Sequence, residues 1–188
     1  MCIRDRAVTQ FYNGLVQLDS NMMIRPCLAK SWVFSEDGLQ ITFKLRTDVS
    51  FHQNEVFEGF TRLLNAHDVV YSFNRIIDEK VASPGSWIFN NKVDRTVPFI
   101  AINDSTFRLN LKQSFAPILG ILSMPYCFVV PKEAIAKYGK DFRANPIGTG
   151  PFTFKVWEEG TALVGLKNEN YFERDDRSQL LPYLDGFK

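Results

Sequence analysis

Two histidines, His52 and His67, are the residues of this 188-residue chain best suited to acid–base chemistry. The charge of histidine changes near neutral pH, so it can serve as a general base, a proton carrier or a metal ligand. A catalytic set also needs a nucleophile and an orienting group beside the base, and neither histidine belongs to a recognisable set. His67 falls in the polar first turn of an expected helix and His52 in a polar loop. We therefore expect solvated or hydrogen-bonded imidazoles, and a protein that is not an enzyme.

Metal binding has little support in the cysteine pattern. Cys2, Cys27 and Cys127 are odd in number and lack metal-type spacing, so neither a disulfide framework nor a zinc site is indicated. His52 and Glu55 are close in sequence, but two ligands do not make a site. We expect buried or incidental thiols, no metal and no cofactor.

The run Gly148-Thr149-Gly150-Pro151-Phe152 has the look of a phosphate-binding loop. Pro151 removes a backbone donor, however, and no Lys-Ser/Thr pair follows, so nucleotide binding is not expected. Neighbouring Gly and Pro favour a tight turn that sets the direction of a strand starting at Phe152. The alternative is that backbone groups of this turn help to line a cleft.

Aromatic residues are abundant, with 17 Phe, 6 Tyr and 3 Trp, and most must fill a core; Trp32 and Phe43 are core candidates. Trp87 differs because it follows Pro84-Gly85-Ser86 in a loop with little to pack against. One aromatic side chain buries about 150–250 Å², which is worth several kcal/mol in a contact at about 25 cal/mol per Å². Trp87 could line a ligand cleft or pack within its own loop.

The composition is that of a globular protein. Hydrophobic residues make up 45% and charged residues 23% of the chain, enough for one sizeable core or one and a half smaller ones. The formal net charge is +1 with mixed signs, which gives no indication of a nucleic-acid or anionic-membrane partner. The longest apolar candidate, residues 118–130, is interrupted by polar residues and is shorter than the roughly 18 residues of a membrane span.

The first six residues carry charges where a secretory signal has its apolar stretch. We interpret residues 1–6 as a junction or artefact, and Cys2 is not expected to be a lipid-anchored cysteine.

Periodicity predicts a mixed α/β set of elements. A helix within residues 7–18 leads into a short strand, and residues 31–34 and 39–45 form a hairpin around Asp37-Gly38 with Leu39, Ile41, Phe43 and Leu45 inward. Asn65 caps a helix over residues 66–77, with Asp68 in its first turn. The remaining elements are a hairpin at 99–102 and 106–111, a helix at 115–122, a buried strand at 127–130, a helix at 131–137, and strands at 152–157 and 163–166.

Several blocks together resemble one family, the peptide-binding and nickel-binding class (family 5) of ABC importer solute-binding proteins. The match runs from about Ala7 to the end of the chain, and the order and spacing of the blocks are also those of the family. The blocks are Phe11-Tyr12-Asn13-Gly14-Leu15-Val16, Leu28-Ala29-Lys30-Ser31-Trp32, Phe43-Lys44-Leu45-Arg46, Ala66-His67-Asp68-Val69-Val70-Tyr71-Ser72-Phe73, Val130-Pro131-Lys132-Glu133-Ala134-Ile135, Lys137-Tyr138-Gly139, Gly148-Thr149-Gly150-Pro151-Phe152 and Asn168-Glu169-Asn170-Tyr171-Phe172.

The resemblance implies a two-lobed clamshell of the type II periplasmic-binding-protein class, with mixed α/β lobes. Residues 7–188 would be an incomplete amino-terminal lobe, with a subdomain over about 30–145 and a return to the main sheet over 146–188. Such a piece is expected to be poorly soluble or loosely folded and to bind peptide weakly by itself.

The resemblance also implies a function in transport. A periplasmic or extracytoplasmic receptor, in some members a lipoprotein, would capture oligopeptides or dipeptides and deliver them to ABC transporter permease subunits. The peptide backbone would be held extended by main-chain hydrogen bonds, and closure of the lobes would follow from contacts with both.

Ligand-binding residues are implied position by position. Trp87, Met124 and Tyr126 match places where relatives approach ligand, and Tyr12 and Asn13 end a helix near the cleft. The strand that pairs with peptide and the acidic anchor for the peptide amino group are not among the matching blocks. Alternatives are a receptor for nickel chelates or another small solute, and a sensor or hydrolase-like domain outside transport.

Overall fold

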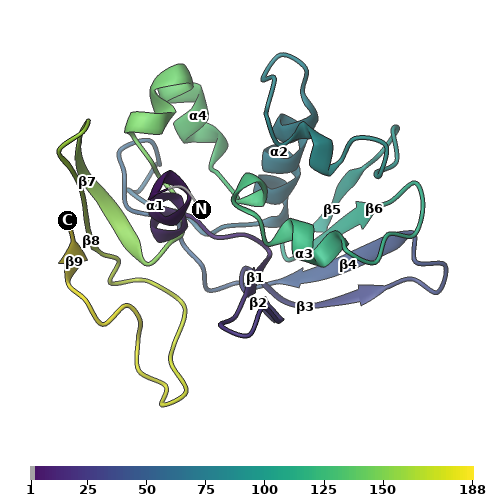
Figure 1. The fold of residues 1–188 in the computed structure, drawn as a ribbon, viewed down its shortest axis with the longest axis horizontal. Coiled ribbons are helices and arrows are strands. Elements are labelled where there is room, and N and C mark those ends of the chain that lie inside the picture. The colour runs from purple at the N-terminus through teal and green to yellow at the C-terminus, as the bar shows by residue number, and fades with distance from the viewer. Residues whose placement is uncertain (1–2) are drawn as a thin grey trace. The chain divides into compact units, whose positions relative to one another are not determined.

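The computed structural model describes the chain from Ile3 to Lys188, and its side chains from Ala7 onward (Figure 1). Cys2 therefore lies outside the described residues. The helices are α1 (Ile3–Phe11), α2 (Ala66–Ile77), α3 (Ile118–Leu122) and α4 (Lys132–Tyr138), with short 3₁₀ turns η1 (Ser86–Ile88), η2 (Pro125–Cys127) and η3 (Gly139–Ala144). The strands are β1 (Val16–Leu18), β2 (Ile24–Pro26), β3 (Ala29–Phe34), β4 (Gln40–Leu45), β5 (Phe99–Asn103), β6 (Thr106–Asn110), β7 (Phe152–Glu158), β8 (Ala162–Lys167) and β9 (Gly186–Phe187).

The chain divides into two compact units. The first unit contains the chain up to Asn13, Asp48–Leu64 and Val130–Lys188, and the second contains Gly14–Thr47 and Asn65–Val129. Both units are built from segments that are not contiguous in sequence.

An antiparallel sheet with the order β3-β4-β6-β5 forms the frame of the second unit. The predicted hairpin pairs Trp32 with Phe43 and Phe34 with Ile41, and the turn contains Gly38 at a φ of 68°, a conformation that glycine adopts without strain. Ile41, Phe43 and Leu45 are buried on one face, as the alternation predicts. The second predicted hairpin is also confirmed, as β5 and β6.

Helix α2 begins where its sequence predicts. The Asn65 side chain accepts a hydrogen bond from the His67 N–H at 2.9 Å, and Asp68 accepts one from the Asn65 N–H at 3.0 Å. This reciprocal capping box satisfies two backbone donors that the first turn of a helix leaves open. The buried stripe of α2 includes Val69, Phe73 and Ile76, and the helix packs on β5 and β6.

Phenylalanine rings fill the core between α2 and the sheet. The Phe73 ring lies 5.2 Å from Phe89, 5.4 Å from Phe99 and 5.5 Å from Phe107, centroid to centroid. Offset and edge-to-face contacts of this kind add to the free energy of burial. Cys27 and Cys127 are both buried in this unit, and burial raises the pKa of Cys127 to about 12.

The first unit is organised around α1 and the sheet β7-β8-β9. Phe11 at the end of α1 contacts Phe154 and Phe187, with ring centroids 6.1 and 5.9 Å apart. The residue 48–64 segment is held to α4 by Arg62, whose guanidinium donates to both carboxylate oxygens of Glu133 at 3.0 and 2.8 Å. The strands predicted at 152–157 and 163–166 are confirmed as β7 and β8.

Two predicted elements differ from the structure. The buried strand expected at 127–130 is wrong, because residues 128–131 have no strand assignment and Cys127 ends the 3₁₀ turn η2. The apolar residues of this segment are alternately buried and half-buried, as in a strand, but the segment has no partner strand. Periodicity in the sequence cannot show whether a partner strand is present. The helix expected at 115–122 begins later, at Ile118 after Pro117.

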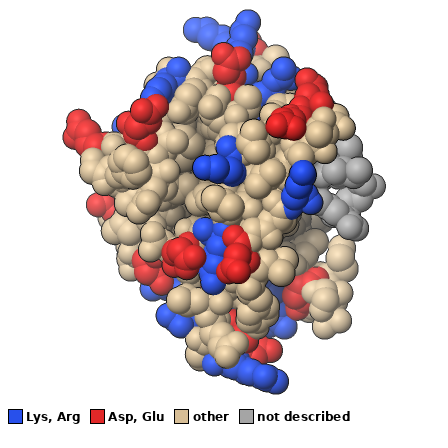
Figure 2. Space-filling model, turned by 90° about the vertical axis from the view of Figure 1, so that its left-hand side faces the viewer, with Lys and Arg blue, Asp and Glu red and all other residues tan. Residues whose placement is uncertain are grey.

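Lys and Arg are interspersed with Asp and Glu over the face drawn in Figure 2, in keeping with the formal net charge of +1. Among the described helices, none has the length and apolar character that crossing a membrane requires.

Candidate ligand-binding site

The turn formed by Gly148, Thr149, Gly150 and Pro151, called here the glycine turn, packs against the end of α1 in the first unit. A Cβ atom on Gly148 would lie 2.1 Å from the Phe11 carbonyl oxygen, and one on Gly150 would lie 2.4 Å from the Phe11 carbonyl carbon. The Gly150 N–H donates to that Phe11 oxygen at 2.9 Å. Both glycines are therefore required by the approach of two backbones, which confirms the expected backbone-determined turn.

The buried side chain of His52, with 4% of its surface exposed, forms hydrogen bonds with two residues of this turn. Its Nδ1 accepts the Gly148 N–H at 3.3 Å, so the proton sits on Nε2, which donates to the Gly150 oxygen at 3.0 Å. Burial lowers the pKa of His52 to about 4, and the bond to Gly150 opposes that only in part. The expected hydrogen-bonded imidazole is confirmed for His52, while solvation is confirmed only for His67, which is largely exposed.

Asn13, one of the predicted ligand residues, belongs to a buried polar network that continues from the glycine turn. Its Oδ1 accepts the Thr149 hydroxyl at 3.0 Å, and its Nδ2 donates to the Tyr171 hydroxyl at 3.4 Å. Asn168 Nδ2 donates to the Gly150 oxygen at 2.9 Å. Asn13, Thr149 and Asn168 are all buried, so the network joins three distant chain segments inside the first unit.

Tyr12, its neighbour, is also buried. Its ring edge would contact a Cβ on Gly148 at 2.5 Å, and its centroid lies 6.1 Å from that of Phe142. Burial raises the pKa of Tyr12 well above its ordinary value, and a hydrogen bond with the Ile147 backbone opposes this shift. The contacts described for Tyr12 and Asn13 are thus contacts that hold the glycine turn.

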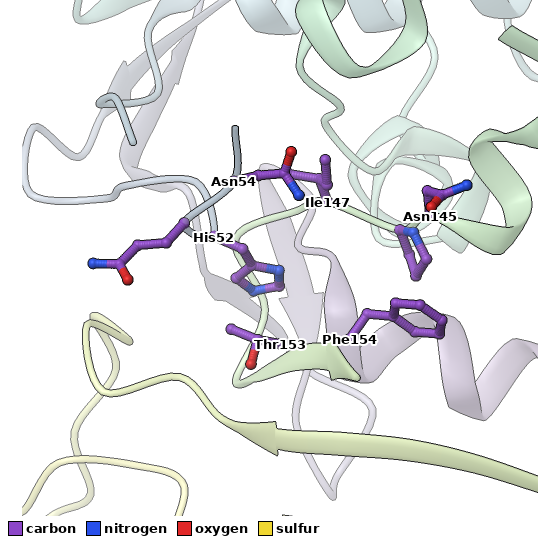
Figure 3. Close-up of a pocket in the computed structure, with 8 residues that line it drawn as sticks. His52, Asn54, Asn145, Ile147, Thr153 and Phe154 are labelled. Carbon is purple, nitrogen blue, oxygen red and sulfur yellow. The ribbon is translucent and has the colours of Figure 1, made fainter. Parts of the chain in front are cut away.

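A pocket lies beside His52, which bonds the glycine turn (Figure 3). Its cavity volume is about 80 Å³, and its lining is His52, Gln53, Asn54, Asn145, Pro146, Ile147, Thr153 and Phe154. Figure 3 shows the His52 ring directed toward Thr153 on β7. Sites for small ligands usually measure about 300–1,000 Å³, so this pocket has room for solvent and not for a peptide.

The other predicted ligand residues, Trp87, Met124 and Tyr126, belong to the second unit, and two of them are exposed. Trp87 in η1 is 46% exposed and Tyr126 in η2 is 44% exposed, while Met124 is half-buried at the start of η2. The Tyr126 ring lies directly on Gly85, where an added Cβ would stand 2.8 Å from two ring atoms. The structure therefore brings the Trp87 loop and the Tyr126 turn together. We call Trp87 and Tyr126, together with Gly85, the aromatic surface.

The sequence did not predict two structural features of these sites, the close packing of Gly85 and the burial of His52. Gly85 was read only as part of a loop, although a Pro-Gly pair before an exposed Trp signals a close approach. The burial of His52 has no local signal, because its neighbours Gln53 and Asn54 are polar and its partners lie about a hundred residues away. In the part of the chain that the structure describes, no group of three or more His, Cys, Asp or Glu is placed to hold a metal ion.

Comparison with known proteins places these features in one family. Residues 23–188 match the family described as bacterial extracellular solute-binding proteins, family 5 Middle. Heme-binding protein A of Haemophilus influenzae is 33% identical over 183 residues, which cover 87% of this chain and 32% of that protein.

Solved structures give the same result. The periplasmic binding protein DppA from Helicobacter pylori, in complex with peptide STSA, has a TM-score of 0.78 and 32% identity, covering 94% of this chain and 36% of that one. NikZ from Campylobacter jejuni, in complex with Ni(L-His), has a TM-score of 0.74 and 29% identity, covering 87% and 31%.

The chain spans about a third of the length of these relatives. Its mixed α/β fold is that of type II periplasmic binding proteins. Members of the family bind solutes for ABC transporters and are not enzymes. The chain belongs to the bacterial extracellular solute-binding proteins of family 5.

Proposed function

We propose that this chain is part of an extracytoplasmic receptor that captures oligopeptides or dipeptides and delivers them to the permease of an ABC transporter. The observation that carries the proposal is the similarity to a peptide-bound DppA, which extends over 94% of the chain. Within the proposal the protein is periplasmic or otherwise extracytoplasmic, and a lipid anchor of the whole protein is one way of holding it near the permease.

The aromatic surface supports a ligand role. Trp87 and Tyr126 keep nearly half of their surface exposed, although residues of this size are usually mostly buried. Aromatic side chains offer a large apolar area with few rotatable bonds, which suits contact with varied peptide side chains. We assign Trp87, Met124 and Tyr126 to ligand contact.

Tyr12 and Asn13 have a different role in this proposal. Their described contacts are internal to the first unit, so they act on a ligand only through the glycine turn that they hold. A substitution at Asn13 should therefore reduce stability before it reduces affinity.

Calorimetric titration with the peptide Ser-Thr-Ser-Ala tests the proposal. We expect saturable binding that weakens about tenfold or more in Trp87→Ala, since one exposed aromatic contact is worth about 1.4 kcal/mol or more. Trp157→Ala, which changes an exposed Trp in β7, is the matched control and should bind as the unchanged chain does. Absence of saturable binding of Ser-Thr-Ser-Ala and of a dipeptide up to millimolar concentration, in titrations at two temperatures, would contradict peptide capture.

A second candidate is a receptor for a metal chelate or another small solute. The observations that favour it are the Ni(L-His) complex of NikZ and the heme-binding relative. Titration with Ni(L-His) and with heme separates the two candidates, because a chelate receptor binds one of these and is indifferent to peptides. Hydrolase activity has no support in a family of solute-binding proteins.

A further inference from the structure

Lys92 occupies a fixed position beside the aromatic surface. Its backbone N–H donates to the Phe89 oxygen at 3.0 Å, and its carbonyl accepts the Lys112 N–H at 2.7 Å. Its neighbour Val93 pairs with Leu111 in an isolated β-bridge. The Lys92 backbone is thereby anchored on both sides inside the second unit, and its side chain starts from a defined point.

The Lys92 ammonium is held between two aromatic rings. Its Nζ lies 5.8 Å from the centroid of the Trp87 ring and 5.7 Å from that of Phe115, and it donates to the Trp87 carbonyl oxygen at 2.8 Å. Rings at this distance attract a cation through their electron-rich faces. The side chain is half-buried and therefore ordered before any ligand arrives, which reduces the entropy lost on binding.

Among the residues that the structure describes, no Asp or Glu carboxylate forms an ion pair with the Lys92 ammonium. The acid nearest in sequence, Asp94, accepts the N–H groups of Thr96 and Val97 at 2.7 and 2.9 Å, which also holds the pKa of its carboxyl below the ordinary value. An ammonium has three N–H donors, and the Trp87 carbonyl takes one.

We propose that Lys92, with Trp87 and Phe115, forms a subsite for a carboxylate group of the ligand. The two remaining N–H donors suit the two oxygens of a carboxylate, and the exposed Trp87 ring suits an apolar group next to it. This inference rests on the proposed function and narrows its substrate class to solutes with a free carboxylate, such as a peptide carboxyl terminus or an acidic side chain.

Calorimetry with two peptides tests the subsite. Ser-Thr-Ser-Ala with a free carboxyl terminus should bind about 10- to 100-fold more tightly than the same peptide with a terminal amide, as expected for a charge-assisted hydrogen bond. Lys92→Met should remove that difference, while Lys92→Arg keeps it. Lys80→Met removes an equally charged, exposed lysine of the same unit and is the control that should leave the difference unchanged. Binding of acid and amide with equal affinity by the unchanged chain would overturn the subsite and leave peptide capture intact.

Sodium benzoate provides a second probe that does not depend on peptide capture. The ¹⁵N resonance of the Lys92 Nζ should shift saturably with benzoate, and Lys92→Met should lose that resonance while circular dichroism confirms its fold. If neither peptide binds but the benzoate shift is present, the proposed function fails and the subsite stands. Absence of a benzoate shift in a folded chain overturns the subsite.

Discussion

Replacing Gly150 by Ala should destabilise the first unit severely. The new Cβ would lie 2.4 Å from the Phe11 carbonyl carbon, 2.6 Å from the Gln10 oxygen and 2.7 Å from the Tyr12 nitrogen. These are backbone atoms at the end of α1, so no side-chain rotation relieves the overlap, and the turn must move away from the helix.

The size of the effect follows from what that movement breaks. Gly150 bonds through its N–H to Phe11, and through its carbonyl to His52 and Asn168. Overpacking costs about 1–3 kcal/mol and each of the three lost hydrogen bonds about 1 kcal/mol, so we expect a loss of about 4–6 kcal/mol in the free energy of unfolding. Domains of this size have only about 5–15 kcal/mol in total.

Hydrogen exchange across a urea series, read by mass spectrometry, measures this loss separately in residues 145–155 and in the second unit. The matched control is Gly120→Ala in α3, where an added Cβ meets nothing within 4 Å and Ala is favoured over Gly by about 1 kcal/mol. Gly120→Ala should be neutral or stabilising. A Gly150→Ala chain that exchanges as slowly as the unchanged chain would refute the close-approach reasoning.

Three further predictions concern His52, the Arg62–Glu133 pair and Gly85. Because the pKa of His52 falls from 6.5 when unfolded to about 4 when folded, its contribution of about 3 kcal/mol is complete above pH 6.5 and is lost as pH falls toward 4. The stability difference between the unchanged chain and His52→Gln should shrink over that range, and a pH-independent difference in urea midpoint would count against it. Glu133→Gln should cost about 1–2 kcal/mol because it breaks a half-buried bidentate pair, whereas Lys137→Ala, at an exposed and solvent-screened pair, should leave stability nearly unchanged; equal losses in thermal unfolding would speak against this ranking. Gly85→Ala should displace the Tyr126 ring and weaken Ser-Thr-Ser-Ala binding, and unaltered Tyr126 ring resonances would disprove the contact.

The sequence predicted the local elements of the fold well. Alternating apolar and polar residues on either side of turn residues predict both hairpins of the second unit, and Asn65 and Asp68 predict the cap of α2. Each of these signals lies within a few consecutive residues. Elements whose formation depends on pairing with residues far away in the sequence were harder to predict. The run at 127–130 is apolar enough for a strand but has no partner, and the two-residue strand β9 forms only through its pairing with β8.

The candidate site shows the same division. The exposure of the Trp87 side chain could be predicted from its position after Pro84-Gly85-Ser86, because a large aromatic residue in a short loop has few local contacts. The burial of His52 could not, since it depends on a turn 96 to 98 residues away. The proposed ligand role of Lys92 was not predictable from the sequence either, because it depends on two aromatic rings that only folding brings close to its ammonium.

The ligand of this chain is tested most directly by amide chemical-shift mapping with Ser-Thr-Ser-Ala, using Ni(L-His) and heme as comparison ligands. We expect saturable shifts with the peptide, largest at Trp87 and Tyr126, and smaller or no shifts with the two chelates. Saturable shifts with a chelate, and none with the peptide at millimolar concentration, would contradict peptide capture.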